Sequence, residues 1–261
     1  MTSSAHPAPI GPMGPSSGPD TLLGRKIPTA IGDYRWVYLW GLPLRAMHWV
    51  AAIAITVLVI TGLYIGTPFG ISGAGTGTSS GLLMSRVRFV HYLAAVFLAT
   101  TGLVRMYWLF AGNRFERLPA LFPMRGRDIK NLFKMAKFYG FMAKKEDTPH
   151  YLGHNPLQQL NYTLVYVLAA LEVVTGFIMF AKAWPTGIMY KLFYWMTPLF
   201  GGIQNVRLIH HSITWFFLIF IPAHVYLSFR GDAVEGGGMV SSIITGGRFF
   251  EPQHAYEDET A

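Results

Sequence analysis

Apolar residues gather in four long stretches, separated by shorter segments rich in glycine, proline and charged residues. Each stretch holds about 20 or more mainly apolar residues, the length that an α-helix needs to cross the hydrocarbon core of a bilayer. The pattern therefore predicts four membrane-spanning helices, over residues 46–66, 89–110, 157–181 and 208–229. No short internal period repeats across the four.

The segments outside these spans divide the chain into one membrane domain and two tails. Residues 1–33 are rich in proline, glycine and serine and lack an apolar core, so they predict a disordered tail rather than a signal peptide. Residues 34–250 form the predicted membrane domain, and 251–261 form a C-terminal tail. Between the second and third spans, residues 127–145 place apolar side chains among lysines. They predict an amphipathic helix, either on an anionic inner leaflet or packed under the bundle.

Composition agrees with a membrane protein and limits its chemistry. Only 13% of the residues are charged, against about 25% in an ordinary soluble domain. The net charge of +8 does not indicate nucleic acid, because the basic residues lie at span ends and in one connecting loop. The chain has no cysteine, which excludes disulfides and iron–sulfur clusters held by this chain.

The basic residues also predict an orientation. If the N-terminus is cytoplasmic, 16 lysines and arginines fall on the cytoplasmic side and 5 on the other. The positive-inside rule then predicts a multi-pass protein of the cytoplasmic (inner) membrane, with both termini cytoplasmic.

Four histidines lie within the spans at two depths. His210 and His224 are 14 residues apart in the fourth span, so they share one helix face at levels about 21 Å apart. His48 begins the first span near the cytoplasmic side, and His91 begins the second near the outer side. Depth therefore pairs His91 with His210 and His48 with His224. Intramembrane histidines are functional when they bind a ligand or a proton, and two matched pairs predict two bis-histidine haem sites that carry electrons.

Other polar residues lie near these histidines. Three arginines each precede one of them by three residues: Arg45, Arg88 and Arg207. Their guanidinium groups suit pairing with haem propionates, with anchoring at the membrane boundary as the alternative. His211 lies off the helix face that His210 and His224 share. We therefore expect it to have a supporting or interfacial role rather than to bind iron. Glu172, inside the third span, suits either a structural hydrogen bond or a proton path.

Four segments resemble the b-type cytochrome subunit of membrane-bound nickel–iron hydrogenases: LRAMHWVAAIAITVLVITGLYIG, RFVHYLAAVFLATTGLVRMYWLFAGN, YLGHNPLQQL and HHSITWFFLIFIPAHVYLSFRGD. The resemblance covers roughly residues 34 to 250, and the wider superfamily includes cytochrome subunits of formate dehydrogenases. It implies an all-α membrane protein, a four-transmembrane-helix bundle that binds two b haems, with amphipathic connecting helices. The positions of His48, His91, His210 and His224 match the family's iron ligands.

The resemblance also implies a function. The chain would be an electron-transfer subunit of a hydrogen:quinone oxidoreductase complex, with no hydrogen-activating centre of its own. Electrons would arrive from the hydrogenase's iron–sulfur small subunit, which joins the chain to the large nickel–iron subunit, and would leave to menaquinone or ubiquinone. His154 and Asn155, in the GHNP turn, are the implied quinone contacts. Asn155 before Pro156 is equally typical of a helix start.

Two other functions stay open. A cytochrome anchor of another quinone-reducing dehydrogenase, of the formate dehydrogenase type, would use the same membrane chemistry. A transporter or proton channel would use histidines as relays, but such proteins gather ionisable groups near the bilayer midplane and often interrupt their helices there. The two histidine depths favour electron transfer.

Overall fold

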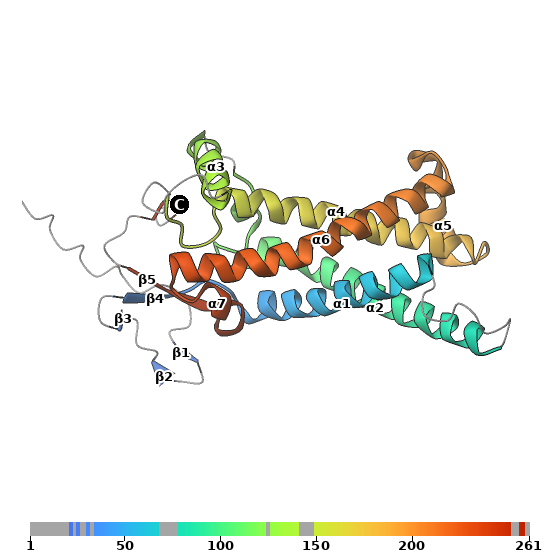
Figure 1. Cartoon of the computed structure of the whole chain (residues 1–261), viewed down its shortest axis with the longest axis horizontal. Coiled ribbons are helices and arrows are strands. Elements are labelled where there is room, and N and C mark those ends of the chain that lie inside the picture. The colour runs from blue at the N-terminus through green and yellow to red at the C-terminus, as the bar shows by residue number, and fades with distance from the viewer. Residues whose placement is uncertain are drawn as a thin grey trace, which may run out of the picture.

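In the computed structural model, four long helices run side by side as an up-and-down bundle (Figure 1). They are α1 (Leu42–Gly66), α2 (Thr78–Ala111), α4 (Pro156–Lys182) and α6 (Ile203–Glu235). All four are long and apolar enough to cross a membrane, which confirms the predicted fold class. The structure describes residues 21–22, 25–26, 30–31, 34–67, 78–123, 126–140, 149–251 and 256–258.

The helices extend beyond the predicted spans. The second helix begins at Thr78 rather than at residue 89, and the fourth runs from Ile203 to Glu235 rather than over 208–229. Hydropathy locates the hydrocarbon core, whereas polar residues in the headgroup region can continue the same helix. Residues 68–77, between α1 and α2, lie outside the described part of the chain.

Local sequence sets several helix ends. Asn155 caps α4 with a complete capping box: its side chain accepts from the Gln158 N–H, and the Gln158 side chain accepts from the Asn155 N–H, both at 3.0 Å. The helix α6 starts after Gly202 and stops at Gly236, with φ angles of 105° and 73°. These positive φ angles favour glycine and break the helical hydrogen-bond ladder.

A small sheet joins the two ends of the membrane domain at one end of the bundle (Figure 1). It consists of β3 (Ala30–Ile31), β4 (Tyr34–Tyr38) and β5 (Gly247–Phe250), all antiparallel, while β1 (Thr21–Leu22) pairs with β2 (Arg25–Lys26). We call this end of the bundle the sheet end, and the opposite end, which carries α5 (Ile188–Phe193), the α5 end. The hydrophobic pattern did not predict this sheet.

The predicted tails are described only in part. Apart from β1, β2 and β3, the predicted N-terminal tail of residues 1–33 lies outside the described residues. In the predicted C-terminal tail, Asp258 accepts hydrogen bonds from the N–H groups of Leu152 and Gly153, at 2.7 and 2.8 Å. Residues near the C-terminus thus pack on the loop that precedes α4.

Shorter helices cover the two ends of the bundle: η1 (Leu118–Leu121), α3 (Gly126–Tyr139), η3 (Tyr194–Phe200) and α7 (Met239–Thr245). The predicted amphipathic helix corresponds to α3. It buries Met135 and Phe138, while Ile129 and Phe133 are exposed among lysines. One face therefore packs under the bundle and the other is free to meet the membrane surface.

The surface of the bundle suits lipid rather than water. No more than 17% of the most apolar window of any spanning helix is buried within the protein, so most of its apolar side chains face outward. In a bilayer this outward face is satisfied by acyl chains. The chain is an integral membrane protein.

Candidate functional site

The structure brings His48 and His224 together at the sheet-end half of the bundle. Their ring centres are 6.4 Å apart and their planes are inclined at 48°. Phe220, one turn before His224 on α6, stacks on its ring at 5.5 Å. His48 and His224 therefore face each other from α1 and α6, as their predicted depths require.

The second pair lies toward the α5 end. His91 of α2 and His210 of α6 are close enough to interact electrostatically. The His91 Nδ1 lies 2.8 Å from the Thr61 hydroxyl, and the His210 Nδ1 lies 3.0 Å from the Thr175 hydroxyl. In both rings Nδ1 is thus engaged, and among the described residues Nε2 has no hydrogen bond.

An apolar layer separates the two pairs. Val59 of α1 packs with Ile213 and Phe217 of α6, and all three are buried. The two α6 histidines lie above and below this layer, about 21 Å apart along the helix axis. The bundle therefore holds two distinct imidazole sites rather than one cluster.

The spacing of the rings fits a haem iron bound by two imidazoles. Two imidazoles on opposite sides of one metal would have ring centres about 6 Å apart, from a metal–nitrogen distance of about 2.0 Å and roughly 1 Å from nitrogen to ring centre. The 6.4 Å between His48 and His224 agrees with that value. Glycines lie against the other two histidine rings. A Cβ added at Gly62 would lie 3.4 Å from His91 Cε1, and one added at Gly176 would lie 3.3 Å from His210 Cε1.

A comparison with family models identifies the fold. The model of the prokaryotic cytochrome b561 family matches residues 39–246, which include all four spanning helices. The chain belongs to the prokaryotic cytochrome b561 family. Haem b is the cofactor that this family implies, and the paired imidazoles are groups that can hold it.

Similar proteins carry a more specific description. A protein of Azotobacter vinelandii, described as a probable Ni/Fe-hydrogenase B-type cytochrome subunit, is 37% identical over 82% of this chain and 89% of its own length. A relative from Cupriavidus necator with the same description is 33% identical over 82% and 87%. One from Escherichia coli K12, described as a probable Ni/Fe-hydrogenase 1 B-type cytochrome subunit, is 26% identical over 81% and 90%.

The arginines predicted to contact propionates have different surroundings in this cytochrome. The Arg45 guanidinium donates from Nη1 to the carbonyl oxygen of Ile244 in α7. Arg207 is exposed and donates to Gln204 Oε1 at 3.3 Å, and Arg88 is exposed near the α5 end of α2. Arg45 thus ties α1 to the C-terminal part of the fold, while Arg88 and Arg207 point to the surface.

The GHNP turn supplies one imidazole and one helix cap. His154 stacks on Trp40 with ring centres 4.5 Å apart and meets the edge of Tyr162 at 4.6 Å. Burial, reinforced by Arg105 and Arg248, lowers the pKa of His154 to about 3. The ring is therefore neutral at physiological pH. The Asn155 amide is used in the cap of α4, so the alternative of a helix start describes what its side chain does.

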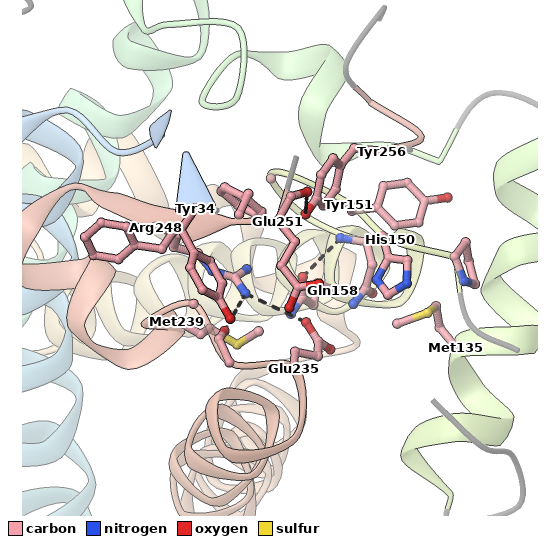
Figure 2. A pocket seen from close by; sticks show the side chains of 17 residues that line it. Tyr34, Met135, His150, Tyr151, Gln158, Glu235, Met239, Arg248, Glu251 and Tyr256 are labelled. Carbon is pink, nitrogen blue, oxygen red and sulfur yellow. Dashed lines mark hydrogen bonds and ion pairs between the residues drawn. The ribbon is translucent and has the colours of Figure 1, made fainter. Parts of the chain in front are cut away.

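A polar pocket of about 100 Å³ lies beside this turn at the sheet end (Figure 2). Asn155 and Gln158 line it from the start of α4, together with Glu235 from the end of α6 and Arg248 from β5. Arg248 Nη2 lies 3.8 Å from Glu235 Oε2 and donates to the Gly236 carbonyl at 3.3 Å. The cytochrome thus has a charged, hydrogen-bonded cavity next to the predicted quinone contacts.

The neutral state of His154 predicts a pH effect on stability. The folded-state pKa of about 3 lies below the ordinary value of 6.5, so the unfolded chain takes up this proton first as the pH falls. Stability is complete above pH 6.5 and decreases between 6.5 and 3, by about 2 kcal/mol at pH 5. We expect His154→Gln to reduce the fall in thermal midpoint between pH 7 and pH 5. An equal fall in both proteins would contradict this origin.

Sequence reasoning singled out Glu172 and His211 but missed Arg105. Arg105, buried in α2, donates to Tyr166 Oη and to the Glu116 carbonyl, both at 3.0 Å. Glu172 accepts from the Thr214 hydroxyl at 2.8 Å and lies 3.3 Å from His210 Nδ1. His211, next in sequence to His210, lies against Gly66 at the end of α1, and its ring centre is 6.4 Å from that of His210.

Proposed function

We propose that this chain is the membrane cytochrome b subunit of a nickel–iron hydrogenase, and that it passes electrons from the iron–sulfur small subunit through two haems b to a quinone. The relatives described as hydrogenase cytochrome subunits support the partner. Through the small subunit the chain would associate with the large nickel–iron subunit. The observation that carries the proposal is the presence of two histidine pairs at two depths of one bundle.

The four histidines are the proposed iron ligands, in the pairs His48–His224 and His91–His210. When bound, haem b would supply reversible one-electron transfer, and an iron held by two imidazoles would offer no site for a substrate. The helices α1, α2 and α6 hold the imidazoles at fixed levels, and the buried side chains between those levels exclude water. Arg88 and Arg207 are proposed to meet propionates at the α5 end. Residues 34–250 would form the complete dihaem domain.

Orientation and the quinone site complete the proposal. The sheet end is proposed to be cytoplasmic, with both termini on that side of the inner membrane, because most of the lysines and arginines belong to segments at this end. Electrons would enter at the α5 end and leave to menaquinone or ubiquinone near His154. A neutral imidazole there offers an N–H donor to a quinone carbonyl. The Asn155 side-chain oxygen caps α4, so Asn155 would contact the quinone only through the part of its amide that the cap does not use.

Isolation of the chain with its partners tests the proposal. We expect purified complex to contain two haems b per chain, with a b-type α band in the reduced-minus-oxidised spectrum. Hydrogen should reduce both haems, and added quinone should reoxidise them. The co-purifying subunits, identified by mass spectrometry, should be those of a nickel–iron hydrogenase. Lack of the α band, or reduction by formate with a formate dehydrogenase as partner, would overturn it.

A further inference from the structure

Each histidine of the α5-end pair has a threonine hydroxyl at one ring nitrogen. His91 Nδ1 lies 2.8 Å from Thr61 Oγ1, and Thr61 itself donates its hydroxyl hydrogen to the Val57 carbonyl at 2.7 Å. His210 Nδ1 lies 3.0 Å from Thr175 Oγ1, and Thr175 donates to the Leu171 carbonyl at 2.6 Å. The same arrangement thus occurs twice, on different helices.

These contacts favour the same tautomer in both rings. A threonine hydroxyl has one hydrogen to donate, and here it goes to the carbonyl one turn earlier. The oxygen is left as an acceptor, so the hydrogen bond requires a proton on Nδ1 of His91 and of His210. Nε2 then carries the free lone pair that a metal needs.

The residue after each threonine restricts the same ring. Gly62 follows Thr61 and Gly176 follows Thr175. A Cβ added at Gly62 would lie in van der Waals contact with His91 Cε1, at 3.4 Å, and one added at Gly176 would lie closer than most side-chain contacts to His210 Cε1, at 3.3 Å. The threonine hydroxyl contacts Nδ1 of each ring, and the backbone of the following glycine packs against the Cε1 edge. Together these two contacts restrict the position and the plane of each imidazole.

The sheet-end pair has no such support. Among the described residues neither His48 nor His224 has a hydrogen bond to a ring nitrogen, and the Nδ1 of His48 is buried without a partner. Their neighbours are aromatic: Phe220 stacks on His224, and Trp49 meets His48 at 5.3 Å. The two pairs therefore differ in the polarity of what surrounds the imidazoles.

From this difference we propose that Thr61 and Thr175 are positioning residues for the α5-end haem, and that they hold its midpoint potential below that of the sheet-end haem. The inference rests on the proposed function, because it takes these histidines as iron ligands. An acceptor at Nδ1–H makes an imidazole a stronger electron donor to its metal and so favours the oxidised iron. Such a difference in potential would favour electron transfer from the α5-end haem to the sheet-end haem.

The two threonines should not contribute equally. At His210, Glu172 Oε2 lies 3.3 Å from the same Nδ1 and can serve as a second acceptor. At His91 no second acceptor is recorded among the described residues. Loss of the hydroxyl should therefore have a larger effect at Thr61 than at Thr175.

Redox titration of the purified full-length chain, followed at the b-type α band, tests this inference. Thr61→Val replaces the hydroxyl with a methyl group of similar shape. We expect it to keep two haems and to raise the lower of the two midpoint potentials, by roughly tenfold in the one-electron reduction equilibrium, or about 59 mV. Thr61→Ser, which keeps the hydroxyl group, should have the wild-type potential. Thr175→Val should give a smaller upward shift than Thr61→Val. A changed low-spin electron paramagnetic resonance signal should accompany the shift.

Thr56→Val is the matched control. Thr56 lies on the same helix and donates to the carbonyl of Ala52, one turn earlier, at 2.8 Å, but it is exposed and has no hydrogen bond to an imidazole among the described residues. Both potentials should stay unchanged in this variant. If Thr61→Val and Thr175→Val also leave both potentials and the signal unchanged, the inference is wrong. His91→Ala separates the two levels: if it loses no haem, the proposed ligation itself fails, whereas loss of one haem with silent threonine variants overturns only the inference.

Discussion

Substitution of His224 by alanine is expected to remove one of two haems b per chain and to abolish electron transfer from hydrogen to quinone. The imidazole is the only polar part of this side chain, and alanine leaves nothing at the position that can bind iron. With His48 as the single remaining ligand, the sheet-end site should not retain its haem. The α5-end pair is about 21 Å away along α6, so its haem should remain. Haem extraction per chain should therefore fall from two to one.

His211, which lies 13 residues before His224 on α6, provides a control on the same helix. It is exposed, and its ring lies against Gly66, with its centre 6.4 Å from that of the adjacent His210 and its plane inclined at 78° to that ring. We expect His211→Ala to retain two haems and the wild-type spectrum. Two haems in purified His224→Ala, with unchanged potentials, would show that His224 is not a ligand and would contradict the assignment of the sheet-end site.

Much of the fold could be predicted because a membrane makes unusually simple demands on a sequence. Each of the four spans must be long and apolar, and this property is visible without any knowledge of contacts. The helix ends were less predictable. Residues 78–88, at the start of α2, include serine, glycine and arginine, and they continue the helix outside the hydrocarbon core where hydropathy has no signal.

The small sheet was missed for a different reason. Trp36 of β4 pairs with Phe249 of β5, more than 200 residues later in the chain. Strands of four or five residues carry too little alternation to be recognised, and their pairing is decided by where the bundle brings the two chain segments. The fold of the helices thus determines the sheet, and local sequence does not.

The candidate site also has a part that the sequence predicts and a part that it does not. The depth of each histidine follows from its place in a span, so the proximity of His48 and His224 could be anticipated, and their role as ligands stays a prediction. The partners of the rings could not be anticipated, because Thr61 and Thr175 are ordinary residues for a spanning helix until the neighbouring helix is known. Glu116 had no signal at all, since it lies in a loop full of charged residues.

Glu116 joins the start of α1 to the end of α2 at the sheet end. Its side chain is only 1% exposed. The carboxyl group accepts from the N–H of Gly41 at 2.5 Å, from Trp108 Nε1 at 2.8 Å and from the N–H of Asn113 at 3.1 Å. Gly41 is the residue immediately before α1, so a negative or strongly accepting group here also suits the positive end of the helix dipole.

We therefore expect Glu116→Ala to destabilise the protein by roughly 3–5 kcal/mol, since three N–H groups would lose their acceptor in a buried position. The start of α1 would lose its anchor, and His48 lies only two turns into that helix. Weaker retention of the sheet-end haem should accompany the lower thermal midpoint. Glu257→Ala is the comparison, because it removes a partly exposed ion pair with Arg127, 2.9 Å long, of the kind that contributes about 0–1 kcal/mol. Equal thermal midpoints and haem contents in the two variants would mean that the Glu116 carboxyl group does not hold α1 in place.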